Sequence, residues 1–269
     1  MSANTSIGVI GAGRMGQPII GHLVRKGFTT TVYDVDPGKR SAVEAHGARW
    51  ASDAAALAAA SDVVLICVGY DEELRALFPD LAAAARPASI YAVLSTVHPN
   101  TVQALAAAAP KGIALVDATM CRGGRAADEG KLLCFVAGEP ATVERLRPVL
   151  GAFASDIVHT GAVGSAQVAK AANNLVLWAC LVADHEALAL AQRHGLDIDR
   201  LRNALLISSA ANDALAKWGT QTMAWAEDDM AIVADMARDC GLKLPQADVT
   251  REICRGLKPQ RYELEKYGR

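Results

Sequence analysis

The sequence has little net charge and lacks the signals that would send a protein to a membrane or out of the cell. Its formal charge is −2 over 269 residues, which gives no electrostatic reason to bind nucleic acid or an anionic membrane. The N-terminus has neither the basic nor the apolar region of a signal peptide. Asp184, His185 and Glu186 interrupt the longest apolar run before it reaches membrane-spanning length. We therefore expect a cytoplasmic protein with no nucleic-acid or membrane partner.

Metal and disulfide motifs are also missing. The six cysteines form no CxxC pair, and the six histidines form no i, i+4 pair of the kind that binds zinc. We therefore expect reduced, mostly buried thiols and no metal site. Aromatic residues make up only 5% of the chain. Trp178, Trp218 and Trp225 are interpreted as core or subunit-interface residues rather than as a stacking platform.

What remains is the pattern of a globular protein in two parts. Hydrophobic residues at 52% and charged residues at 21% provide ample material for a core, and the length suggests two domains. Through residue 162, short apolar runs alternate with helical patterns, which predicts a Rossmann-type α/β domain with a doubly wound, mostly parallel sheet. Only helical patterns follow, so we predict an all-helical domain at 163–269, led by a long helix that ends near His194.

The expected elements can be given by residue range. Strands are predicted at 6–10, 29–33, 62–68, 88–94, 113–116, 131–137 and 155–159. A helix is predicted between the glycine motif at 11–16 and Gly27, and further helices at 52–60, 72–85, 100–109, 140–150, 199–206, 210–239 and 245–255. The polar tail after residue 256 is expected to be loosely held.

A glycine motif follows the first predicted strand. Its residues are Gly11, Ala12, Gly13, Arg14, Met15 and Gly16. Between a strand and a helix, Gly11 permits the tight turn, Gly13 lets the backbone approach a pyrophosphate, and Gly16 allows close packing. The N-terminus of the helix offers free N–H groups to the phosphates. We predict a dinucleotide site, and a flavodoxin-like turn without nucleotide is the alternative.

Asp34 ends the second predicted strand and bears on the choice of dinucleotide. A carboxylate at this place accepts a hydrogen bond from a ribose 2′-hydroxyl and repels a 2′-phosphate. The sequence therefore favours NAD over NADP as the cofactor. Lys39 and Arg40, close by in the chain, keep NADP open.

The other candidates lie where predicted strands end, because ligands bind beyond the carboxyl ends of such a sheet. They are Val68 with the 69–71 loop, the Ser95-Thr96 turn, and the segment 117–124. In that segment Gly123 and Gly124 suggest backbone exposed to a ligand, and Arg122 could grip a carboxylate. A glycine turn with a solvated arginine is the alternative.

The stretch 161–190 carries three polar side chains on a helix rich in Ala, Val and Leu. Lys170, Asn173 and Asn174 are spaced i, i+3 and i+4, so they project from one face. Desolvating a lone lysine is costly, which makes such a residue paired, solvent-reaching or functional. A lysine that simply reaches water beside the helix start is the ordinary alternative.

Four motifs, in order, resemble those of the β-hydroxyacid dehydrogenase family, which includes 3-hydroxyisobutyrate dehydrogenase, tartronate semialdehyde reductase and 6-phosphogluconate dehydrogenase. They are GAGRMG at 11–16, STVHP at 95–99, DATMCRGG at 117–124 and GSAQVAKAANN at 164–174. The resemblance covers nearly the whole chain. It implies an oxidoreductase that transfers a hydride between NAD and a small hydroxy acid.

The resemblance also implies roles for single residues. Lys170 corresponds to the family's catalytic lysine, and Asn174 to its substrate-orienting asparagine, with Asn173 alongside. Thr96 would touch the nicotinamide ribose or the substrate. Reversible oxidation of a hydroxyl then needs a base beside the carbinol, and Lys170 is predicted to supply it.

The predicted substrate-binding residues include departures from the family pattern. Gly123 matches a glycine of the substrate-carboxylate loop, and Asp229 matches the acid of a C-terminal Lys-Asp pair. However, Cys121 and Arg122 replace a Ser-Gly pair, and Asp228 replaces the lysine. These changes leave the identity of the substrate open.

Two other functions compete with this hypothesis. One is an imine or aldehyde reductase of the same superfamily, and the other is a nucleotide-binding protein without catalysis. The retained Lys170 and Asn174 weigh against both. Because residues 175–190 are apolar on most faces, we also predict a homodimer or homotetramer that buries this helix.

Overall fold

The computed structural model describes residues 5–268 and divides into two compact units, residues 1–170 and 171–269. Each unit has its own clusters of buried apolar side chains, two in the first unit and two in the second. One helix, α8 (Ser165–Arg193), begins in the first unit and continues into the second.

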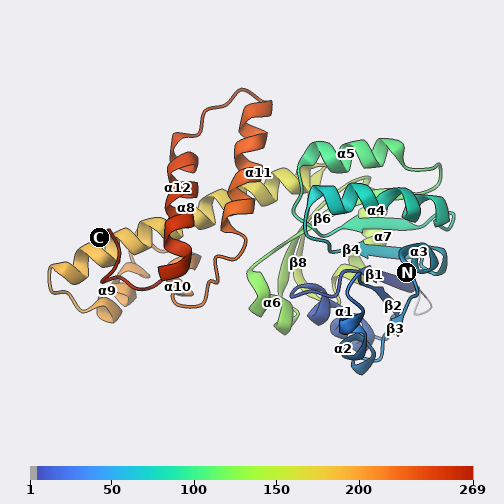
Figure 1. The fold of residues 1–269 in the computed structure, drawn as a ribbon, viewed down its shortest axis with the longest axis horizontal. Helices are drawn as coiled ribbons and strands as arrows, with labels where there is room; N and C mark the ends of the chain where they lie inside the picture. Colours follow the sequence, from blue (N-terminus) through green and yellow to red (C-terminus); the bar gives the residue numbers. More distant parts are fainter. Residues whose placement is uncertain (1–4, 269) are drawn as a thin grey trace. The chain divides into compact units, whose positions relative to one another are not determined.

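An eight-stranded sheet forms the centre of the first unit (Figure 1). Its order is β3-β2-β1-β4-β5-β6-β7-β8. The strands are β1 (Ser6–Ile10), β2 (Thr29–Tyr33), β3 (Arg49–Trp50), β4 (Val63–Ile66), β5 (Ile90–Val93), β6 (Ala114–Cys121), β7 (Leu132–Ala137) and β8 (Ala154–Gly161). Strands β1 to β6 are parallel, whereas β7 is antiparallel to β6 and β8 is parallel to β7. The predicted doubly wound, mostly parallel sheet is therefore confirmed.

The order of strands reverses between β1 and β4. The chain builds outward from β1 to β3 and then returns to lay β4 on the other side of β1. Helices that follow strands on either side of such a point leave on opposite faces, which opens a crevice at the carboxyl ends. The glycine turn after β1 lies at this point.

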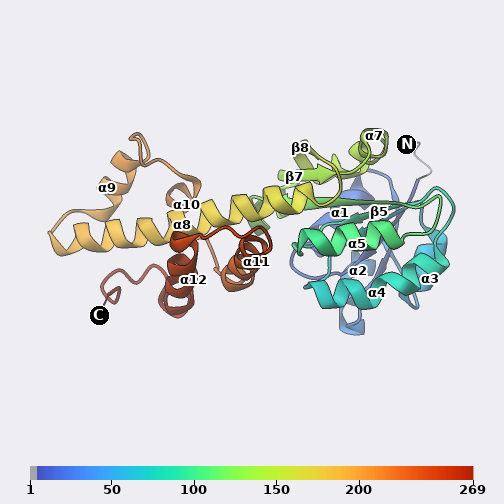
Figure 2. The ribbon, with the colours of Figure 1, turned by 90° about the horizontal axis from the view of Figure 1, so that it is seen from above.

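Helices cover both faces of the sheet. The first-unit helices are α1 (Gly16–Arg25), the 3-10 helix η1 (Pro37–Lys39), α2 (Arg40–Ala45), α3 (Ala54–Ala60), α4 (Asp71–Ala84), α5 (Pro99–Ala108), α6 (Gly123–Glu129) and α7 (Pro140–Leu150). One core cluster contains residues of α1, α2, α6 and α7, and the other contains residues of α3, α4 and α5. Figure 2 shows α4 and α5 side by side.

Strand β4 shows why the central strands read as continuous apolar runs. Val63 and Leu65 belong to one core cluster, while Val64 and Ile66 belong to the other. All four are fully buried, because a strand covered on both faces has no side for polar residues.

The second unit is helical throughout its described residues, 171–268. It contains the rest of α8 together with α9 (Ile198–Leu205), α10 (Asp213–Ala216), α11 (Ala226–Asp239), α12 (Pro245–Leu257) and the 3-10 helix η2 (Lys258–Gln260). Trp178 and Leu181 of α8 pack with Met230 of α11 and Cys254 of α12 in its main core cluster. The predicted helical second part is confirmed.

The predicted single helix at 210–239 is wrong. The chain forms the short α10, then an irregular segment, and resumes as α11 at Ala226. Asn212 caps α10 by accepting the backbone N–H of Leu215 at 2.8 Å. Gly219 (φ +86°) and Met223 (φ +56°) have left-handed backbone that ends helical continuity.

The tail after α12 is also different from the prediction, because it is packed rather than loosely held. The backbone N–H of Tyr262 donates to Nε2 of His185 at 3.0 Å, and the Tyr262 hydroxyl donates to the carbonyl of Gln221, also at 3.0 Å. Leu264 is buried in a small cluster with Leu188 and Leu215. Single apolar residues within a polar segment thus hold it in place, and composition alone does not reveal them.

Apart from the two 3-10 helices, three short elements have no counterpart in the sequence-based prediction: β3, α2 and α6. Each is seven residues or shorter and has too few apolar positions to show a period.

Helix α8 is the one helix among residues 5–268 whose length and hydropathy would permit it to cross a membrane, and 44% of its most apolar window is buried inside the structure. A core helix passes the same test, so the finding does not by itself indicate a membrane protein.

Candidate active site

The glycine turn between β1 and α1 leaves space for a ligand at one position. Gly11 has φ +95°, and a Cβ there would lie 2.1 Å from the carbonyl oxygen of Cys67, so only glycine fits. A Cβ on Gly16 would lie 2.0 Å from the carbonyl oxygen of Gly11. A Cβ on Gly13 would meet no atom of residues 5–268 within 4 Å. The backbone at Gly13, beside the N-terminus of α1, is therefore open to close approach by a phosphate.

Asp34, directly after β2, lies in a dense set of hydrogen bonds. Its Oδ2 accepts the backbone N–H of Ala12 at 2.7 Å, and its Oδ1 accepts that of Asp36 at 2.9 Å. The ammonium of Lys39 lies 3.0 Å from both oxygens. Burial alone would raise the pKa of the Asp34 carboxyl, but the N–H groups of Asp36 and Ala12 and the Lys39 ammonium lower it overall. The carboxylate is therefore charged near neutral pH.

These residues fit a dinucleotide. An open glycine backbone at a helix N-terminus suits the pyrophosphate, and a charged carboxylate at the end of β2 suits a ribose hydroxyl. One feature departs from a simple NAD site, because a ribose hydroxyl at Asp34 would have to share the carboxylate with Lys39.

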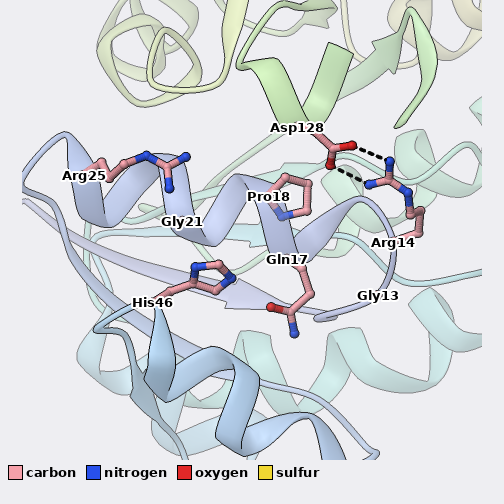
Figure 3. A pocket seen from close by; sticks show the side chains of 8 residues that line it. All are labelled: Gly13, Arg14, Gln17, Pro18, Gly21, Arg25, His46 and Asp128. Carbon is pink, nitrogen blue, oxygen red and sulfur yellow. Dashed lines mark hydrogen bonds and ion pairs between the residues drawn. The ribbon is translucent and has the colours of Figure 1, made fainter. Parts of the chain in front are cut away.

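A pocket of about 490 Å³ opens along the outer face of α1 (Figure 3). Gly13, Arg14, Gln17, Pro18, Gly21, Arg25, His46 and Asp128 line it. Arg14 forms a two-point ion pair with Asp128 of α6, at 2.8 and 2.7 Å. Because the guanidinium of Arg14 is paired with Asp128, the predicted contact of Arg14 with the cofactor is left to its backbone in the glycine turn. Met15, the next residue, packs against the core.

The turn after β5 is held by its neighbours on the 68–71 loop. The hydroxyl of Ser95 donates to the carbonyl of Val68 at 2.8 Å. The backbone N–H of His98 donates to the carboxylate of Asp71 at 3.1 and 3.2 Å. Thr96 lies between these two attachments and is half-buried.

The first turn of α8 is fixed to the sheet by side chains of β6. Asp117, fully buried, accepts the backbone N–H groups of Gly164 at 2.9 Å and Gln167 at 3.1 Å. Burial raises the pKa of the Asp117 carboxyl, and those two N–H groups oppose the rise. The hydroxyl of Thr119 donates to the carbonyl of Ala166 at 3.1 Å. The two bonds to Asp117 satisfy backbone N–H groups that a helix start leaves without intrahelical partners, and the bond from Thr119 adds a second attachment to β6.

Gln167 connects the same turn of α8 to the loop that carries Thr96. Its Oε1 accepts the backbone N–H of Val97 at 3.0 Å, and its Nε2 donates to the carbonyl of Ser95 at 2.9 Å. Lys170 follows three residues later, so it projects on the same side of the helix as Gln167. The side chain of Lys170 is half-buried.

The segment Cys121-Arg122-Gly123 joins β6 to α6. Cys121 is buried, and Arg122 has left-handed backbone (φ +82°) that favours glycine. The guanidinium of Arg122 binds Asp156 at 2.6 Å and Ser155 at 2.9 Å, both on β8. A carboxylate ligand at Arg122 would therefore compete with Asp156. Gly123 also has positive φ, +76°.

The remaining predicted residues belong to the second unit. Asn174 is 1% exposed, and its Nδ2 has no hydrogen-bond partner among residues 5–268, while its Oδ1 accepts Nδ2 of Asn173 at 3.1 Å. A buried donor left unpaired is costly and points to a missing acceptor. Asp229, on the first turn of α11, accepts the indole N–H of Trp178 at 2.9 Å.

Two of these contacts escape a reading of the sequence. In the sequence Lys39 is only a nearby charge, and nothing there shows that it pairs with Asp34. Gln167 belongs to no recognisable pair of polar residues, although its spacing of three from Lys170 is a usable signal.

No cluster of three or more His, Cys, Asp or Glu side chains suited to a metal occurs within residues 5–268.

Comparison with known protein families covers almost all of the chain. A model described as the NAD binding domain of 6-phosphogluconate dehydrogenase matches residues 6–161. A second, described as the NAD-binding of NADP-dependent 3-hydroxyisobutyrate dehydrogenase, matches residues 164–265.

Individual proteins agree with these models. A probable 3-hydroxyisobutyrate dehydrogenase of Mycobacterium tuberculosis is 35% identical over 198 residues, which covers 73% of this chain and 67% of that protein. An NAD-dependent L-serine dehydrogenase of Pseudomonas aeruginosa is 31% identical over 247 residues, which covers 88% of this chain and 83% of that protein. The solved structure of Mycobacterium tuberculosis 3-hydroxyisobutyrate dehydrogenase with L-serine matches with a TM-score of 0.88 at 28% identity, covering 96% of this chain and 94% of that chain.

Proposed function

The chain belongs to the β-hydroxyacid dehydrogenase family and is an NAD(P)-dependent oxidoreductase, and from that premise we propose that Lys170 is the general acid/base of its reaction. The family resemblance carried by the four sequence motifs and the prediction of an oxidoreductase are both confirmed by these matches. The roles of single residues remain our proposal.

The observation that carries the proposal is the anchoring of α8 one turn before Lys170. Asp117, Thr119 and Gln167 fix that turn to β6 and to the Ser95–Val97 loop. A lysine that follows on the same side of the helix starts from a fixed backbone position, and its side chain is only half-buried and so stays accessible. A lysine that merely reached solvent would not need such support.

In the proposed reaction a bound nicotinamide supplies the hydride acceptor, and the residues of the chain handle the proton and the geometry. The neutral amine of Lys170 removes the hydroxyl proton as the carbonyl forms, and its ammonium returns a proton in the reductive direction. Asn174, four residues further along α8, donates from its unpaired Nδ2 to an oxygen of the substrate. The predicted substrate contacts of Asn173, Cys121, Gly123 and Asp229 remain proposals.

The substrate is proposed to be a small 3-hydroxy carboxylic acid. Support comes from two relatives, one named for 3-hydroxyisobutyrate and one for L-serine. Both of these compounds carry a hydroxyl group on C3, two carbons from the carboxylate carbon. Arg122 reaches the substrate in this proposal only by giving up its contact with Asp156.

The cofactor is proposed to be NAD rather than NADP. The charged carboxylate of Asp34 supports this choice, because it repels a 2′-phosphate. The ammonium of Lys39 partly cancels that repulsion, so we expect a preference for NAD rather than strict exclusion of NADP.

A substrate panel tests the proposed function. The purified protein is incubated with NAD or NADP and with 3-hydroxyisobutyrate, L-serine, or a 2-hydroxy acid, and separately with NADH or NADPH and a cyclic imine. The change in reduced nicotinamide is measured by its absorbance. We expect turnover with at least one 3-hydroxy acid and a higher kcat/KM with NAD. Turnover confined to the reduction of a cyclic imine, or cofactor binding without any turnover, would contradict the proposal.

A further inference from the structure

Gln167 uses both ends of its carboxamide on one short loop. Its Oε1 accepts the N–H of Val97 at 3.0 Å, and its Nε2 donates to the carbonyl of Ser95 at 2.9 Å. The two bonds span Thr96. The side chain is 1% exposed, so it makes them away from water.

The backbone of Gln167 is fixed independently of its side chain. Its N–H donates to the buried carboxylate of Asp117 at 3.1 Å, and the preceding residue, Ala166, accepts the hydroxyl of Thr119. The carboxamide therefore starts from a rigid point on α8. The loop is also held from the far side, by the bond from Ser95 to Val68 and by the carboxylate of Asp71.

We propose that Gln167 is a positioning residue that sets the place of Thr96 relative to Lys170. This inference rests on the proposed role of Lys170. In this proposal Thr96 holds the nicotinamide ribose and Lys170 moves the proton. Because the loop and the lysine are both attached to one turn of α8, the distance between these two side chains is fixed. Misplacement of reacting groups by about 1 Å can reduce a rate by about 100-fold.

Replacement of Gln167 by methionine, a side chain of similar length and volume, tests the proposal. Gln167→Met removes both bonds to the loop and leaves the backbone bond to Asp117 in place. We expect kcat to fall by about 10-fold to 100-fold, with a much smaller change in KM for the hydroxy acid. The Kd for NADH, measured by fluorescence titration, should rise much less than kcat falls, because only the contact of Thr96 with the nicotinamide ribose is disturbed, while the glycine turn and Asp34 are untouched.

Thr119→Val is the matched control. It removes a side-chain bond to the same turn of α8 but makes no change at the 95–97 loop. If Gln167 acts only by anchoring the helix, both variants will lose kcat in proportion to their fall in Tm. The proposal predicts a much larger loss of kcat in Gln167→Met than in Thr119→Val, and equal losses at equal loss of Tm would overturn it.

Gln167→Glu supplies a readout that a merely structural role would not move. An ionised glutamate can still accept the N–H of Val97 but cannot donate to the carbonyl of Ser95, whereas a protonated one can do both. Burial and the neighbouring carboxylate of Asp117 favour the protonated form. We therefore expect the ratio of the variant's kcat to that of the wild type to rise as pH falls. A ratio independent of pH at a low value, or an unchanged kcat in Gln167→Met, would overturn the proposal.

The outcomes also separate this inference from the proposed function. An inactive Lys170 variant together with a fully active Gln167→Met would reject the positioning role alone. An active Lys170 variant would reject the proposed function whatever the Gln167 variants do.

Discussion

At the scale of single residues, the ion pair between Lys39 and Asp34 sets the charge at the proposed binding site for the adenosine ribose. Asp34 is 7% exposed and charged, and Lys39 sits 3.0 Å from both of its oxygens. Without Lys39 the carboxylate would be free to accept a ribose hydroxyl but would repel a phosphate more strongly.

Lys39→Met should therefore sharpen the preference for NAD. We expect the Kd for NADP to rise by about 10-fold or more, equivalent to about 1.4 kcal/mol, and the Kd for NAD to stay the same or fall. Fluorescence titration with both cofactors measures the two constants. Arg40→Met is the control, because Arg40 is paired with Glu44 instead. An equal loss of affinity for both cofactors in Lys39→Met would show that Lys39 does not discriminate between them.

Arg122 shows a second conflict at residue scale, between a backbone that favours glycine and a side chain that binds Asp156. Two substitutions separate the cost of the backbone strain from the loss of the ion pair. Arg122→Gly and Arg122→Ala both lose the ion pair, but only alanine keeps the left-handed strain. We expect the glycine variant to be more stable than the alanine variant by about 1 kcal/mol in urea unfolding. Equal stability would mean that the loop adopts another backbone conformation in solution.

At the scale of elements, the C-terminal tail is fastened to α8 through His185. Nδ1–H of His185 donates to the carbonyl of Leu181 at 2.7 Å, because Nε2 is occupied in accepting the N–H of Tyr262. The imidazole must be neutral to do both. It also stacks on the ring of Tyr262, with centroids 5.3 Å apart.

Acid should weaken this attachment. Burial lowers the pKa of His185 below 6.5, so the unfolded chain takes up a proton first as pH falls, and the contribution to stability declines below about pH 6.5. We expect the free energy of unfolding to fall between pH 6.5 and 5 and this part of the fall to vanish in His185→Phe. Chemical unfolding at a series of pH values measures it, and an identical pH profile in the variant would refute this role.

The elements also show how far sequence reasoning reaches. Long periodic segments such as α8 and buried apolar strands such as β4 were predicted, because burial imposes a repeating pattern on them. The break between helices at 217–225 and the packed C-terminal tail are not predicted from the sequence. They depend on left-handed backbone at Met223 and on single contacts of Tyr262, which have no local signature. At the site, the sequence predicts the motif residues. It contains no pattern that pairs Lys39 with Asp34, and the partners of Gln167 lie 70 and 72 residues away along the chain.

At the scale of the whole molecule, α8 carries an exposed apolar stripe. Val168, Val176 and Leu190 are 47%, 62% and 62% exposed. At about 100° per residue they fall within about 80° of one another around the helix. Exposed apolar rows of this kind are typical of protein interfaces, so the predicted homodimer or homotetramer remains our proposal.

Sedimentation tests this assembly. We expect the wild type to be a dimer or tetramer at micromolar concentration and Val176→Glu to shift it toward monomer. Val249→Glu is the matched control, since Val249 is 59% exposed but lies on α12. A wild type that sediments as a monomer, or equal dissociation in the two variants, would reject α8 as the interface.

In the proposed reaction Lys170 moves the proton, and replacement of its ammonium tests this role most directly. Lys170→Met keeps the length of the side chain, and Lys111→Met, on an exposed lysine, is the control. We predict that kcat for oxidation of the best 3-hydroxy acid falls by about 1,000-fold or more in Lys170→Met, while the Kd for NADH changes by less than about threefold and Lys111→Met stays at the wild-type rate. Retention of more than about a tenth of kcat in Lys170→Met would contradict the account.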